Sequence, residues 1–60
     1  MSPCIVAKAK YALGIPNSFH GNNKTCSQAY WNKTVNRLGA QNGLSASKIA
    51  RARGRTDLFR

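Results

Sequence analysis

The C-terminal stretch of the chain contains the side chains best suited to bind phosphate. It carries five cations, which are Lys48, Arg51, Arg53, Arg55 and Arg60. Arginine can donate two parallel hydrogen bonds to phosphate oxygens, and it stays charged at every physiological pH. The only carboxylate of the chain, Asp57, lies in the same stretch and can neutralise just one of these cations. The residue types and their spacing predict a phosphate-binding surface.

Cations also occur throughout the rest of the chain. The formal net charge is +9, from ten Lys and Arg against one acid. Self-repulsion of this size opposes compaction unless a polyanion supplies counter-charge. We therefore expect nucleic acid as the partner, with anionic membrane and acidic protein as the alternatives. A second phosphate-binding patch is expected from the cations nearer the N-terminus, which are Lys8, Lys10, Lys33 and Arg37.

The residues available for catalysis are few. One carboxylate, one histidine and two cysteines do not supply an acid, a base and a third group to orient them. Cys26 and His20 would form a nucleophile pair only inside a shaped pocket, which a chain of 60 residues can hardly enclose. We expect a protein that is not an enzyme and that has no cofactor and no small-molecule substrate.

Cys4, Cys26 and His20 are three possible zinc ligands. They include no CxxC pair and no fourth Cys or His, so they cannot complete a closed tetrahedral zinc site, and we expect no metal. No secretory signal is evident, and no apolar run approaches the roughly 20 residues that cross a bilayer. We therefore expect two reduced thiols in an intracellular compartment, and no membrane partner.

Short helices are predicted to position the cations. The first should span residues 3–13, with Ser2 as N-cap, Pro3 at the first helical position and apolar residues at four-residue spacing until Gly14. Residues 14–24 are rich in Gly, Asn, Ser and Pro, which is typical of a loop.

The second predicted helix spans residues 26–42. Thr25 to Gln28 fits a capping box, and Trp31, Val35 and Leu38 follow at helical spacing. Asn42-Gly43 supplies a residue that readily adopts the left-handed conformation that ends many helices.

The third predicted helix spans residues 46–53, followed by a basic tail at 54–60. Ser45 is its N-cap, and Leu44 and Ile49 occupy the hydrophobic staple positions around it. Lys48, Arg51 and Arg55 recur every three or four residues and should form a basic ridge, to which Arg53 adds from one side. Five apolar side chains should pack together or against a neighbouring protein, namely Trp31, Val35, Leu38, Leu44 and Ile49.

Together these patterns predict a single small basic chain, 1–60, of the mainly α class. It should contain two to three short helices and extended, partly irregular segments. Chains of this length bury only roughly 60% of their unfolded surface, and large apolar residues are scarce here. We therefore expect the partner to order the chain.

Residues 37–54, RLGAQNGLSASKIARARG, resemble the first helices of a repressor-type helix-turn-helix domain. In that family a scaffold helix ends at a Gly-Leu-Ser turn, which corresponds here to Gly43, Leu44 and Ser45. The resemblance implies a recognition helix beginning near Thr56, but the sequence ends at Arg60. The resemblance therefore identifies no residue of this chain that would contact bases. No family match covers the whole chain.

Charge, length and composition are also similar to those of small ribosomal proteins. We therefore expect a non-catalytic component of a ribonucleoprotein that binds rRNA phosphates and contacts neighbouring proteins. Its expected location is intracellular and ribosome-associated, with cytoplasm and mitochondrion both open. The alternatives are a DNA-binding helix-turn-helix fragment that regulates transcription and a virion-internal protein that binds a genome.

Overall fold

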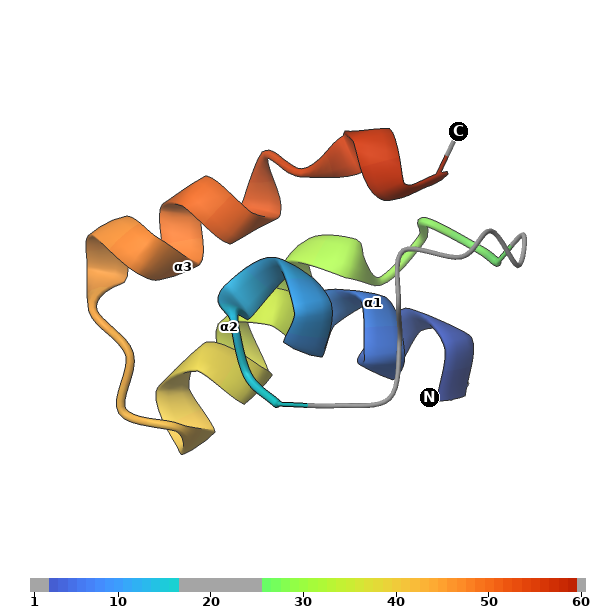
Figure 1. Cartoon of the computed structure of the whole chain (residues 1–60). Helices are drawn as coiled ribbons and strands as arrows, with labels where there is room; N and C mark the ends of the chain where they lie inside the picture. Colours follow the sequence, from blue (N-terminus) through green and yellow to red (C-terminus); the bar gives the residue numbers. More distant parts are fainter. Residues whose placement is uncertain (1–2, 17–25, 60) are drawn as a thin grey trace.

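The computed structural model describes residues 3–16 and 26–59. These residues form three α-helices and one 3-10 helix, which are α1 (Pro3–Leu13), α2 (Trp31–Gln41), α3 (Ala46–Arg53) and η1 (Thr56–Phe59). The chain is mainly helical, as predicted, and no strand occurs among the described residues. Figure 1 shows α3 and η1 running along one side of the molecule, with α1 and α2 on the other.

Helix α1 has the predicted bounds, although its predicted N-cap, Ser2, lies outside the described residues. It ends at Gly14, whose φ of 76° is the left-handed conformation that glycine adopts without steric cost. The Gly14 amide donates to the Tyr11 carbonyl at 3.1 Å, and the Ile15 amide donates to the Lys10 carbonyl at 2.9 Å. These two bonds satisfy carbonyls that the helix end would leave unpaired.

Helix α2 begins at Trp31, so the prediction that it starts at residue 26 was wrong. Thr25 of the predicted capping box lies outside the described residues. The Ser27 hydroxyl accepts a hydrogen bond from the Ala29 amide at 3.1 Å. Such local side-chain bonds compete with helix formation, which accounts for the late start. The helix ends at Gln41, one residue before the predicted end, with Asn42 as cap and Gly43 at a φ of 65°.

Helix α3 has the predicted bounds and the predicted cap. The Ser45 hydroxyl accepts from the Lys48 amide at 3.3 Å, and Gly54 closes the helix. The segment after it is more ordered than the predicted tail, because Thr56–Phe59 forms η1. Arg60 lies outside the described residues.

All three α-helices contribute to one core. Its buried apolar residues are Ile5, Ala9, Leu13, Trp31, Val35, Leu38 and Ala52. Leu44 and Ile49 are partly buried and pack against this core, which confirms that the five predicted apolar residues pack together.

Helices α2 and α3 approach closely at Gly39. A Cβ atom at this position would lie 2.7 Å from Ile49 Cδ1 and would also overlap Ile49 Cγ1. Ile49 therefore packs directly on the α2 backbone, which only a residue without a side chain permits.

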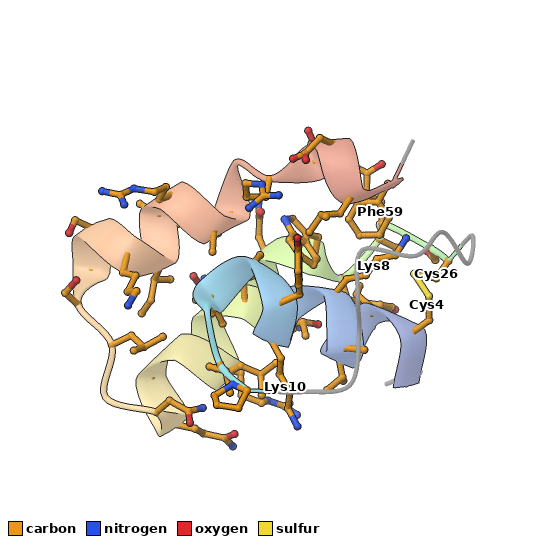
Figure 2. All side chains as sticks on the ribbon, in the orientation of Figure 1. Cys4, Lys8, Lys10, Cys26 and Phe59 are labelled. Atoms are coloured by element: carbon orange, nitrogen blue, oxygen red, sulfur yellow. A yellow bond between two sulfur atoms is a disulfide. The ribbon has the colours of Figure 1, made fainter. Side chains whose placement is uncertain are left out.

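A disulfide joins Cys4 to Cys26, so the prediction of two reduced thiols was wrong (Figure 2). The bond connects the first turn of α1 to the segment before α2, and the two Cα atoms are 6.1 Å apart. This separation is within the range that a disulfide spans. The prediction relied on the compartment alone, whereas the packing of α1 beside the start of α2 determines whether the sulfurs meet.

Candidate nucleic-acid interface

Lys8 is in the core rather than on the surface. It is 2% exposed, and its Nζ donates to the Leu58 carbonyl at 2.7 Å. The same Nζ lies 4.8 Å from the centroid of the Phe59 ring, a cation–π distance (Figure 2). Because the ammonium group is enclosed by the C-terminal segment, we leave Lys8 out of the candidate interface. Its role in this structure is to hold η1 on the helices.

Lys10 points in the opposite direction from Lys8. The two residues are about 200° apart around a helix, and Figure 2 shows Lys10 on the side of α1 that faces away from Phe59. Lys10 is half-buried.

Arg55 is paired with the only acid. Its Nε and one terminal nitrogen donate to the two Asp57 carboxylate oxygens at 3.1 and 3.3 Å. The hydrogen bond to Asp57 raises the pKa of Arg55 above its ordinary value. The guanidinium carbon also lies 5.9 Å from the centroid of the Tyr11 ring. Arg55 is therefore engaged within the chain, and the predicted basic ridge loses one free charge.

Arg53 is at the junction of α3 and α2. Its guanidinium donates to Asn36 Oδ1 at 2.8 Å, and its backbone carbonyl accepts from Trp31 Nε1 at 3.0 Å. Asn36 is neutral, so Arg53 keeps its charge, but its side chain is oriented toward α2.

The remaining predicted cations of α3, Lys48 and Arg51, are exposed. They are three residues apart and thus lie on one side of the helix. Neither side chain has a hydrogen bond or ion pair to any part of the chain that the structure describes. Both are therefore available to a ligand.

Helix α2 presents a second pair. Lys33 and Arg37 are four residues apart, exposed, and likewise without a hydrogen bond or ion pair to residues 3–16 and 26–59. We call Lys33, Arg37, Lys48 and Arg51 the free cations.

The structure thus divides the predicted site residues. It brings Lys48 and Arg51 together on α3 and Lys33 and Arg37 together on α2, while it encloses Lys8 and pairs Arg55 with Asp57. Lys8 follows Ile5 by three residues, and this spacing was a signal that it shares the core side of α1.

Other kinds of site find no support in the described residues. No group of three His, Cys, Asp or Glu side chains lies close enough there to hold a metal ion. None of the helices in this part of the chain has the length and apolarity to cross a bilayer.

No protein-family model, no curated protein and no solved structure matches this chain.

Proposed function

We propose that this chain is a non-catalytic RNA-binding protein that holds phosphate groups through its free cations. The observation that carries the proposal is their distribution: four exposed cations have no partner among the described residues, while the single acid is already engaged by Arg55. Phosphate oxygens would supply the missing counter-charge. Lys10 would add to the positive electrostatic potential on the side of the molecule away from η1.

The host that fits this proposal best is a ribonucleoprotein, most simply a ribosome. Positive charge spread over more than one helix suits a partner that surrounds the protein, as folded RNA does. Tyr30, which is 61% exposed, is suited to contacts with neighbouring proteins.

Duplex DNA is the competing nucleic acid, because the helix-turn-helix resemblance implies base reading by an element that begins near Thr56. The structure has η1 at this position, a helix of four residues. Its Leu58 carbonyl accepts from Lys8, and its Phe59 ring packs on Trp31 with centroids 5.0 Å apart. Our proposal therefore uses phosphate contacts alone.

The Cys4–Cys26 disulfide bears on the location of the protein. Disulfides persist in oxidising compartments and are rare in the cytosol. An intracellular, ribosome-associated location requires this bond to resist the glutathione pool, which a reduction potential below about −300 mV would achieve. Redox titration of the chain in glutathione buffers measures that potential, and a much higher value would argue against cytoplasm.

Binding to RNA is tested by fluorescence anisotropy with a labelled single strand over a range of salt concentrations. Each phosphate neutralised on a single strand contributes about −0.7 to the slope of log affinity against log salt, so four contacts predict about −2.8. The double variant K48Q/R51Q should make the slope shallower by about 1.4.

The matched control is R53Q/R55Q. It removes the same amount of charge, but from two arginines that are engaged by Asn36 and Asp57. It should change the slope less than K48Q/R51Q does. Equal slopes for the wild type and K48Q/R51Q would show that Lys48 and Arg51 do not contact phosphate. Absence of RNA binding by the wild type would refute the proposed function.

The disulfide favours a second candidate, attachment to an anionic lipid surface outside a reducing compartment. Tyr11 and Tyr30 are exposed by 40% and 61%, and tyrosine is suited to the membrane–water interface. Flotation with vesicles of phosphatidylserine and phosphatidylcholine distinguishes the two functions. Tight flotation without RNA binding would favour the lipid surface.

A further inference from the structure

The free cations form two pairs that point in different directions. Gly39 of α2 and Ile49 of α3 mark the line along which the two helices touch. Measured as a rotation about the axis of α2, Lys33 is about 120° from Gly39 and Arg37 is about 160° from it. Arg37 thus lies on the side of α2 that faces away from α3, whereas Lys33 lies nearer the contact, three residues from the Asn36 that is bonded to Arg53.

The α3 pair is also displaced from the contact with α2: relative to Ile49, Lys48 is displaced by about 100° and Arg51 by about 160°. Arg53 marks the α2-facing side of α3, because its guanidinium is bonded to Asn36. Relative to Arg53, Lys48 is displaced by about 140° and Arg51 by about 160° around the helix. The two pairs are thus displaced from the α2–α3 contact in different directions around their helices. In Figure 1, α3 lies along one side of the molecule and α2 on the other.

The dimensions of the molecule are much smaller than the length over which a nucleic-acid duplex bends. The described residues extend 28 × 22 × 19 Å. The persistence length of duplex DNA is about 50 nm, so one short duplex cannot bend around a body of this size to contact both sides. Two cationic sides on such a body can instead contact two separate phosphate backbones at once.

We infer that the chain is a bridge that joins two double-stranded nucleic-acid segments, with the α2 pair on one backbone and the α3 pair on the other. This inference rests on the proposed function and adds to it the number and arrangement of the ligands. A bridge also accounts for the placement of the free cations on two sides, whereas a protein that lies on one duplex needs only one cationic side. Within a folded RNA the two segments would be two helical arms.

The test uses two short RNA duplexes of unrelated sequence, one labelled with a donor fluorophore and the other with an acceptor. Wild-type protein should produce energy transfer between them. The transfer should be maximal near one chain for two duplexes and should fall at excess protein, because each duplex then acquires its own chain. K33Q/R37Q and K48Q/R51Q should each lose the transfer while still binding a single duplex through the remaining pair.

R53Q/R55Q is the control, since it removes the same charge as either pair variant and leaves both pairs intact. It should retain the transfer, and circular dichroism establishes that all three variants are folded. Binding of single duplexes by the wild type without any transfer would overturn the bridge and leave the proposed function standing. Transfer that survives in both pair variants would also overturn it, because bridging would then come from self-association. Failure of the wild type to bind any duplex or single strand would instead refute the proposed function.

Discussion

The ammonium group of Lys8 donates a hydrogen bond of 2.7 Å to the carbonyl oxygen of Leu58, fifty positions further along the chain. Lys8 is in the middle of α1 and Leu58 is in η1, so this bond connects the N-terminal and C-terminal parts of the fold. A buried lysine is costly unless its charge is compensated. Here the carbonyl and the Phe59 ring supply that compensation.

Replacing Lys8 by methionine should destabilise the protein. Methionine fills similar space but leaves the Leu58 carbonyl without its donor, and loss of such a buried hydrogen bond costs about 1–3 kcal/mol. Urea unfolding followed by the fluorescence of Trp31, which packs on Phe59, measures the change. K10M is the control and should be nearly neutral, because Lys10 is only half-buried. A K8M protein as stable as the wild type would show that desolvation of the ammonium offsets its contacts.

Replacing Gly39 by alanine should cost about 1–3 kcal/mol, because the new Cβ overlaps the Ile49 side chain. Thermal unfolding of G39A, I49A and the double variant gives their coupling. Ile49→Ala removes the overlapping atoms, so the cost of G39A should nearly vanish in that background. Gly54 is the control: its φ is −78° and a Cβ there would meet nothing closer than 3.5 Å, so G54A should be tolerated. Additive effects of G39A and I49A would contradict the contact.

Reduction of the Cys4–Cys26 disulfide should lower the free energy of unfolding by about 3 kcal/mol, the chain-entropy value for a loop of this length. The two cysteines are separated by 22 positions, so the bond closes a substantial part of the chain. Thermal melts with and without a phosphine reductant test this. The C4S/C26S variant should melt like the reduced protein and should not respond to the reductant. A melt of the wild type that the reductant leaves unchanged would contradict a stabilising disulfide.

The effect of the α3 pair on binding should not depend on RNA sequence. Phosphate contacts fix a protein on nucleic acid without reading bases. K48Q/R51Q should therefore weaken binding by the same factor for RNAs of unrelated sequence, measured by competition in one anisotropy assay. A change in the order in which the RNAs are preferred would show that Lys48 or Arg51 contacts bases.

Helix boundaries could be predicted wherever a local signal determined them. Gly14 and Gly43 end their helices at positive φ, and the hydroxyl of Ser45 caps α3. Each of these helix ends lies within a few residues of the sequence pattern that predicted it. The start of α2 could not be predicted in this way. The Thr25–Gln28 pattern suits a cap, but the Ser27 hydroxyl bonds to the Ala29 amide and the helix begins later, at Trp31.

The candidate site was predicted only in part. Charge identified Lys33, Arg37, Lys48 and Arg51, and the structure leaves these four exposed. Lys8 was predicted to contribute to a phosphate-binding patch because of its charge. The spacing from Ile5 indicates a core-facing position, but the contacts with η1 that enclose the ammonium group are between residues far apart in the sequence.

The sequence by itself determined the large positive charge, the helical class and the ends of α1 and α3, because these depend on composition and on interactions between residues near one another in the chain. Only the tertiary structure decided which cations are free, that Cys4 and Cys26 are bonded, and that the two free pairs face apart. These properties depend on distances between residues that are remote in sequence, and packing of the helices against one another is what sets those distances.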